Sequence, residues 1–175
     1  MKKLIYLFVF SFLIVSCDSL SDAVELKVSN DLIENIDVNV IQTQGAPVAF
    51  DFFETLNLNS GELTQYKGKI KALKVNKLSY KFKNFSGNEN GEIQIGTLMF
   101  DDIKIGRLTN INISKAASAG TVFEVTDVNV LSSIETAFLS DNTATIKLFG
   151  TVLSDAGTMD FVVEVFMNMT ATVKD

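Results

Sequence analysis

Apolar and polar residues alternate with a period of two along most of the chain after residue 23. Successive side chains of a β-strand point to opposite faces, so this alternation predicts strands with one buried face. The stretches with this pattern are residues 24–28, 36–40, 73–85, 92–100, 103–114, 121–125, 143–153 and 158–173. Asn30 and Asp31 favour turns and predict one between the first two strands. Residues 46–58, which include the only proline, are expected to be extended.

The last two predicted strands show the clearest alternation. In 158–173 one face, predicted to be the core face, carries Phe161, Val163, Val165, Met167 and Met169, and Glu164 is predicted to point the other way. Two apolar residues on the face of Glu164 indicate that this face is also partly covered. Residues 154–157 predict a turn that joins the two strands into a hairpin. Gly150, inside the first of them, is expected to mark a bulge.

Two short segments have helical spacing instead. Residues 60–69 predict one or two helical turns. Ser132 and Glu135 have the spacing of a capping box, with Ser132 as the N-cap, and predict a helix that ends near residue 139. The residues expected to share its buried face are Ile134, Phe138 and Leu139.

About eight strands joined by Gly, Asn and Asp turns, with one or two short helices, are typical of an all-β protein. We expect an antiparallel β-sandwich, or a barrel-like closure of the same strands. No internal repeat or low-complexity run divides the chain. The pattern therefore predicts a single domain over residues 24–175.

The N-terminus has the three parts of an export signal. Lys2 and Lys3 precede a twelve-residue stretch, residues 4–15, which is apolar except for Ser11 and is followed by a small residue and Cys17. Twelve residues form a helix of about 18 Å, which is shorter than the roughly 30 Å hydrocarbon layer. This segment therefore predicts a cleaved signal peptide and not a membrane span.

Residues 14–17, Ile-Val-Ser-Cys, resemble the lipobox of bacterial lipoproteins. The resemblance implies a signal peptide over residues 1–16, cleavage before Cys17, and diacylglycerol on the Cys17 sulfur, usually with acylation, for example by palmitate, of its new amino group. Two or three acyl chains anchor a protein stably. Residues 17–23 would then form the lipidated cysteine and a tether, and the expected location is the cell envelope.

Removal of residues 1–16 leaves 159 residues with 13 basic and 21 acidic side chains, a net charge of about −8. Such an acidic protein is a poor ligand for nucleic acids or anionic headgroups. We therefore expect no nucleic-acid partner, and we expect the membrane contact to run through the lipid on Cys17 and not through a basic face.

Missing residue types limit the possible chemistry. The chain has no histidine, and its one cysteine is the predicted lipid carrier, so His-based triads and His- or Cys-ligated metals are excluded. No catalytic motif, cofactor or metal site is predicted. Asp101 and Asp102 lie close in sequence to the 88–92 loop and could supply oxygen ligands for Ca²⁺. Because the spacing of a recognisable calcium loop is absent, we interpret both as solvated turn residues.

Aromatic residues raise a second alternative. They could line a cavity for a lipid, but they are more simply explained as core residues in a protein without tryptophan. The residues concerned are Phe50, Phe52, Phe53, Tyr80, Phe82 and Phe85.

The tether carries a second short resemblance. Asp18-Ser19-Leu20 is similar to the O-glycosylation signal of Bacteroidota, which would make Ser19 a sugar acceptor. The Asn-, Lys-, Ile- and Phe-rich composition also resembles that phylum. In Bacteroidota, Asp18 after the lipidated cysteine is compatible with the outer membrane, which we favour over the inner membrane.

Three functions remain for the mature chain. The first is a non-enzymatic envelope lipoprotein that binds an envelope protein or glycan or has a structural role. The second is a carrier of a hydrophobic ligand, which would need an apolar cavity between the sheets. The third is an enzyme of unrecognised type, which would need a cleft with convergent, pKa-perturbed groups. A filled core with an exposed apolar patch would favour the first.

Overall fold

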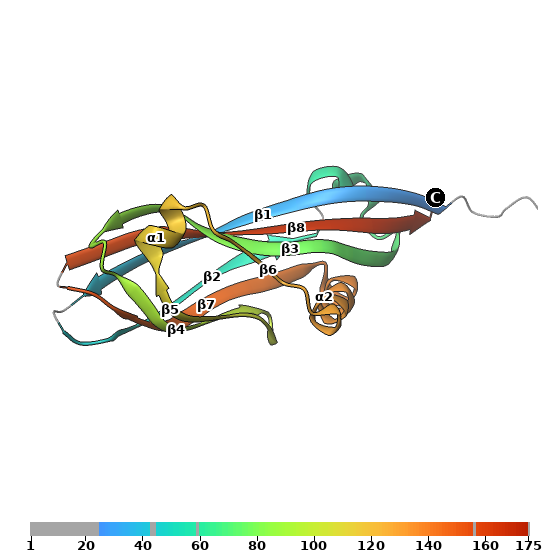
Figure 1. Cartoon of the computed structure of the whole chain (residues 1–175). Helices are drawn as coiled ribbons and strands as arrows, with labels where there is room; N and C mark the ends of the chain where they lie inside the picture. Colours follow the sequence, from blue (N-terminus) through green and yellow to red (C-terminus); the bar gives the residue numbers. More distant parts are fainter. Residues whose placement is uncertain (1–24, 43–44, 59, 156, 175) are drawn as a thin grey trace, which may run out of the picture.

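The computed structural model describes residues 25–42, 45–58, 60–155 and 157–174. In this part of the chain, two four-stranded sheets pack face to face, and every pair of neighbouring strands is antiparallel (Figure 1). The predicted antiparallel β-sandwich is therefore confirmed, with two separate sheets and not one closed barrel.

The strands divide between the sheets with little regard to their order in the chain. Sheet A contains β1 (Glu25–Gln42), β3 (Ile70–Gly87), β6 (Val122–Glu124) and β8 (Gly157–Lys174), arranged as β1-β8-β3-β6. Sheet B contains β2 (Val48–Asn57), β4 (Glu92–Phe100), β5 (Ile103–Asn112) and β7 (Thr143–Leu153), arranged as β2-β7-β4-β5. The helical segments are the 3₁₀-helix η1 (Gly61–Tyr66), α1 (Ile113–Ser118) and α2 (Val128–Asp141).

The turn predicted at Asn30 and Asp31 is wrong. β1 runs through both residues and pairs with β8 along its whole length. Asn30 is buried, where its Nδ2 donates to the carbonyl of Ser60 and its Oδ1 accepts from the N–H of Glu62. Its side chain therefore holds η1 against the strand, which explains a turn-favouring residue at this position.

The hairpin predicted from the last two strands is also wrong, although β7 has the predicted bounds and β8 differs by one residue at each end. β7 pairs with β2 and β4, whereas β8 pairs with β1 and β3. The connection around residues 154–157 carries the chain from sheet B to sheet A. The predicted facing of β8 is confirmed, because its odd-numbered side chains from Met159 to Val173 are all buried. Alternation specified the buried face of each strand but not its partner.

The helix near residue 134 exists, but its predicted start is wrong. Asp127 and not Ser132 caps α2, so the helix begins five residues earlier than the capping box implied. Glu135 instead accepts a hydrogen bond from the backbone N–H of Val75, beside a bulge in β3. Leu139 is exposed and does not share the buried face of Ile134 and Phe138.

Of the other two helical segments, η1 was predicted from the sequence and α1 was not. The turns predicted in 60–69 are confirmed as η1. Helix α1 was not predicted, because the alternation of 103–114 was read as strand to its end. Asn112 stops the strand by capping α1, and its Oδ1 accepts from the backbone N–H of Lys115. Both α-helices contact β3 and β5, and so cover one open side of the sandwich.

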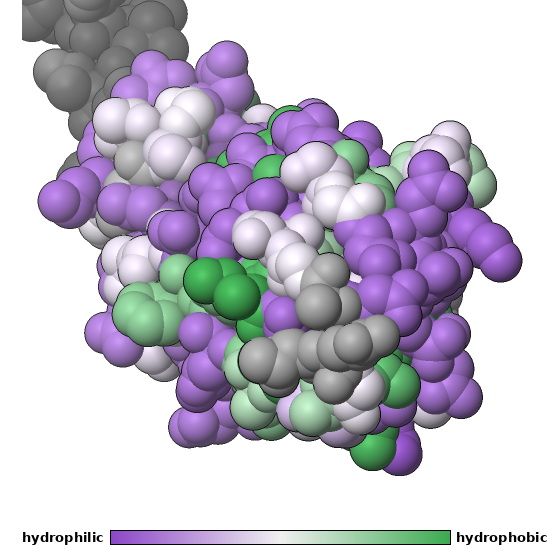
Figure 2. Space-filling model, turned by 90° about the vertical axis from the view of Figure 1, so that its left-hand side faces the viewer, coloured by the Kyte–Doolittle hydropathy of each residue, from purple (hydrophilic) through white to green (hydrophobic). Residues whose placement is uncertain are grey.

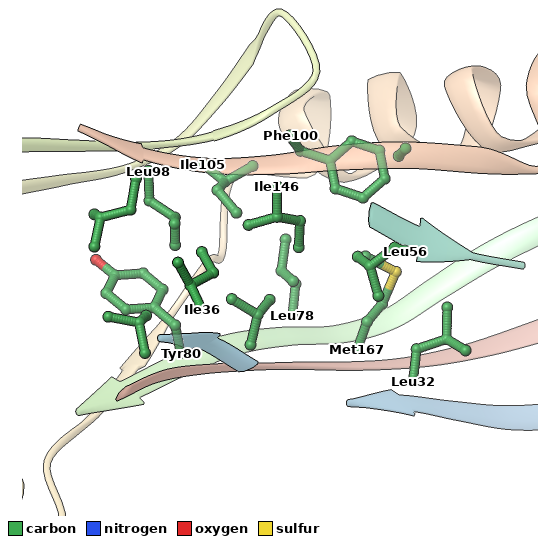
Figure 3. Close-up of a cluster of buried hydrophobic side chains, with 14 of the residues drawn as sticks. Leu32, Ile36, Leu56, Leu78, Tyr80, Leu98, Phe100, Ile105, Ile146 and Met167 are labelled. Atoms are coloured by element: carbon green, nitrogen blue, oxygen red, sulfur yellow. The ribbon is translucent and has the colours of Figure 1, made fainter. Parts of the chain in front are cut away.

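Side chains from both sheets fill the space between them (Figure 3). Most of the candidate cavity aromatics belong to this core: Phe50, Tyr80 and Phe82 are buried, and Phe52 and Phe85 are partly buried against it. Phe82 contacts the rings of Phe123 and Phe161, each with its centroid 5.9 Å away. Phe53 is the exception and is exposed.

The sandwich has two distinct ends (Figure 1). Glu25, at the start of β1, lies opposite Lys174, at the end of β8, so the described chain begins and ends side by side. The β1–β2, β3–β4 and β7–β8 connections lie at the other end, because β1, β3 and β7 all run toward it. We call these the terminal end and the loop end.

Candidate functional site

The sequence-predicted site residues are only partly within the described structure. Cys17, Ser19 and the residues assigned to the signal peptide and tether lie outside the described residues. No helix in the described ranges combines the length and the apolar character needed to cross a membrane.

Asp101 and Asp102 do not approach the 88–92 loop. They form the turn between β4 and β5, and the nine residues of β4 separate them from that loop by roughly 25–30 Å. Asp101 ties the turn to β7, because its N–H donates to the carbonyl of Thr145 and its Oδ1 accepts from the Thr145 N–H. Among the described residues, no group of three or more Asp, Glu, His or Cys side chains is arranged to hold a metal ion.

Several polar side chains at the loop end form hydrogen bonds with one another. The Asp155 carboxylate accepts from the side-chain amides of Asn88 and Asn90, and the Asn88 side chain accepts from the backbone N–H of Asn90. Figure 2 looks onto this end and shows a mainly hydrophilic surface with small, separated hydrophobic areas. These contacts tie the described residues of the β3–β4 and β7–β8 connections to each other.

Glu164 lies on the outer face of sheet A between two lysines. Its carboxylate is 2.9 Å from the Lys81 Nζ and 2.7 Å from the Lys83 Nζ, and its side chain is 17% exposed. Hydrogen bonds from Lys81 and then Lys83 lower the pKa of Glu164 below its ordinary value. A general acid that works near neutral pH needs a raised carboxyl pKa, so Glu164 does not suit that role. Burial raises the pKa of Tyr80, which keeps that core phenol neutral.

A hollow of about 500 Å³ lies on the outer face of sheet B. Strands β2, β7 and β4 supply its lining, which consists of Ala49, Phe50, Asp51, Ile95, Phe149, Gly150 and Thr151. Gly150, one of the lining residues, is paired with Phe50 on one side and with Gly96 on the other.

Gly150 does not carry the predicted bulge, which lies on the neighbouring strand. The register between β4 and β7 shifts between Ile93 and Ile95, so the extra residue belongs to β4. The β4 backbone lies so close that a Cβ on Gly150 would be 2.2 Å from the Ile95 carbonyl oxygen and 2.7 Å from the Gly96 Cα. Glycine is therefore required at position 150 because two backbones meet there.

Three large apolar side chains are exposed on this face of sheet B: Phe53 (66%), Ile95 (56%) and Phe149 (37%). We call these three residues the outer patch. Asp51 and Lys147 lie among them as an ion pair of 2.9 Å, and the Lys147 Nζ is 5.4 Å from the centre of the Phe149 ring. The patch thus has an apolar surface with a neutralised pair of charges beside it.

Sequence reasoning missed the outer patch, although a signal was present. In β7 the buried residues Ala144, Ile146, Leu148 and Val152 are even-numbered, so strand alternation places Phe149 on the opposite, outward face. The same argument places Phe53 outward in β2, because the buried residues of that strand, Phe50 and Leu56, are even-numbered. A large apolar residue at a position where strand alternation predicts a polar one is the signal that would have identified the outer patch.

No known protein family matches the chain, and no curated protein has a detectably similar sequence. What the protein does has to be inferred from its own residues. Chemically, the outer patch can bury apolar surface of a partner.

Proposed function

We propose that this protein is a lipid-anchored lipoprotein of the cell envelope whose β-sandwich binds another envelope protein through the outer patch. The observation that carries the proposal is the exposure of Ile95 and Phe149 at one hollow, with Phe53 exposed on the same outer sheet face, on a sheet whose other face covers a filled core. Exposed apolar patches bordered by polar residues mark interaction sites.

The chemistry of the patch favours a protein partner over a glycan. A sugar requires free hydrogen-bonding groups near an open aromatic ring. Here the Asp51 carboxylate is paired with Lys147, and Lys147 also lies over the Phe149 ring. An apolar centre that contains aromatic residues, with charges beside it, is typical of the centre of a protein interface.

The two alternative functions have less support. A carrier of hydrophobic ligands needs a site that encloses most of the ligand, whereas the hollow lies on an outer sheet face and the aromatic rings between the sheets pack on one another. An enzyme needs groups whose pKa values suit proton transfer, and the pKa of Glu164 is shifted away from neutral pH. We therefore favour a non-enzymatic binding module.

The lipobox resemblance supports the membrane location. Seven residues, 18–24, separate Cys17 from the start of β1, and a chain of that length spans at most about 25 Å. A lipid on Cys17 would therefore hold the terminal end of the sandwich close to the membrane. Outer-membrane placement and glycosylation of Ser19 remain parts of this proposal that rest on sequence resemblance.

The anchor is tested by Cys17→Ala. We expect the variant to incorporate no radiolabelled palmitate and to escape lipoprotein signal cleavage, because the sulfur that would carry diacylglycerol is gone. Ser19→Ala is the control, and it should be labelled and cleaved like the parent while it loses any glycan at that position. Equal labelling of the Cys17→Ala variant and the parent would refute the lipid anchor.

The partner surface is tested by placing a photo-crosslinking residue at position 95 or at position 33 in the full chain in its own cells. Ile95 lies in the outer patch and Ile33 on the outer face of sheet A, and both are 56% exposed. We expect one discrete crosslinked partner from position 95 and none from position 33. The double substitution Phe53→Ser and Phe149→Ser should reduce that product about tenfold, since apolar anchors dominate interface energy.

The matching control removes apolar surface from the other sheet, by Ile33→Ser with Ile41→Ser, and should leave crosslinking at position 95 unchanged. Equal crosslinking from both positions, or a product that persists in the Phe53 and Phe149 double variant, would contradict the assignment of the patch.

A further inference from the structure

Six lysines gather at the terminal end of the sandwich. They come from β1, from the turn before β3, from β3 itself and from β8, and all six are exposed: Lys27, Lys67, Lys69, Lys71, Lys74 and Lys174. Glu25 and Glu62 are the acidic residues among the described positions of the same segments, 25–29, 60–74 and 170–174. We call this set of lysines the basic end.

Strand pairing brings these lysines together from distant parts of the chain. Glu25 is the pairing partner of Lys174, Lys27 pairs with Thr172, and Ile70 pairs with Val173. The backbone N–H of Lys174 also donates to the carbonyl of Lys69. β1, β3 and β8 therefore place their lysines at the same end of the sandwich.

The remainder of the described structure has the opposite charge. Outside the basic end, the described residues hold seven basic and sixteen acidic side chains. The net charge of the chain does not show that its positive and negative side chains are concentrated in different parts of the sandwich. An anionic surface would attract the basic end and repel the rest of the sandwich.

The chain enters the sandwich at this same end. Residues 18–24, which connect Cys17 to β1, can span at most about 25 Å, so a lipid on Cys17 keeps the basic end near the headgroups. Charge attraction acts over a Debye length of about 8 Å at physiological salt, and lysines close to an anionic leaflet each strengthen binding.

We infer that the basic end is a second membrane contact, which binds anionic phospholipid headgroups and holds the sandwich end-on with the loop end away from the membrane. The inference rests on the lipid anchor of the proposed function. It replaces the expectation from net charge that the membrane contact runs through the lipid alone. A tethered site has a high effective concentration of headgroups, so weak intrinsic affinity is sufficient.

The inference is tested with the mature chain from residue 18, which keeps every described strand and helix and has no lipid. We expect it to float with phosphatidylcholine vesicles that contain about 30 mol% phosphatidylglycerol and not with pure phosphatidylcholine. Raising the salt from about 50 to about 300 mM should release it. Lys67→Glu with Lys71→Glu should weaken the binding about tenfold or more.

The single substitution Lys115→Glu is the matched control for the single substitution Lys67→Glu, because both change the net charge by the same amount. Lys115 lies on α1, outside the basic end. Lys115→Glu should leave binding within about twofold of the parent, since its distance from the headgroups exceeds a Debye length. Absence of binding to the anionic vesicles, equal binding to both vesicle types, or an equal loss in Lys115→Glu would overturn the inference. None of these outcomes depends on palmitate labelling or on crosslinking at position 95, which test the proposed function separately.

Discussion

Replacing Phe161 by alanine is expected to lower the free energy of unfolding by about 3–5 kcal/mol. Phe161 is buried on the inner face of β8, where its ring lies 5.9 Å from that of Phe82 and its backbone pairs with Val38 of β1. Truncation removes the transfer energy of the ring and leaves a cavity in a central strand that cannot collapse. Urea unfolding of the mature chain would measure the loss.

Two neighbours on β8 provide the comparison. Val163 is also buried, and Val163→Ala should cost about 2 kcal/mol. Glu164 points to the other face, and Glu164→Gln removes only its charge interactions with the partly exposed Lys81 and Lys83, so we expect a loss within about 1 kcal/mol. A loss at Glu164 as large as that at Phe161 would mean that the facing of the strand is wrong.

Gly150→Ala is expected to destabilise the sandwich by about 3 kcal/mol or more, since overpacking against backbone atoms is costly. The new Cβ would lie 2.2 Å from the Ile95 carbonyl oxygen, and neither backbone can move without breaking the pairing of β4 with β7. Thermal or urea unfolding of the mature chain would measure the effect.

Gly45→Ala separates this clash from ordinary glycine strain. Gly45 has a positive φ of 78° but nothing within 4 Å of an added Cβ, so its substitution should cost only about 1–2 kcal/mol. If Gly150→Ala costs no more than Gly45→Ala, the close approach of the two strands is not rigid, and the hollow beneath the outer patch is not fixed by it.

These stability tests also bear on the binding surface. Because Gly150 lies between Phe149 and the bulge in β4, the backbone contact that requires glycine also shapes the hollow beside Ile95. Ile95 and Phe149 of the outer patch therefore lie on the two paired central strands of sheet B, β4 and β7, which are a rigid support for an interface, and Phe53 lies beside them on the edge strand β2.

The sequence alone determined the strands and their buried faces. A side-chain period of two is local, because each residue points opposite to the next, and hydrophobic burial then selects one face. This is why Phe161, Val163 and Val165 were placed correctly, and why β7 was bounded correctly. The anchor at Cys17 was likewise read from a local motif, and it stays a prediction.

Only the tertiary structure decided which strands are partners. Pairing is set by burial across the whole molecule, so β7 and β8 lie in different sheets although a short turn joins them. The same cause explains the errors at Asn30 and Glu135, whose polar groups bond backbone groups of η1 and β3 that are distant in sequence. The sequence pattern predicted a turn at Asn30 and a capping box at Glu135, because it compares each residue only with its neighbours in the chain.

The candidate surfaces depend on the same long-range pairing. Phe53, Phe149 and Ile95 share one sheet face because β7 lies between β2 and β4, and Lys27, Lys71 and Lys174 share one end because β8 lies between β1 and β3. Net charge and composition are sums over the chain, so they do not say where in the structure the charged residues lie. The sequence therefore determined an acidic β-sandwich, and the tertiary structure decided that six of its lysines would gather at the end where the described chain begins.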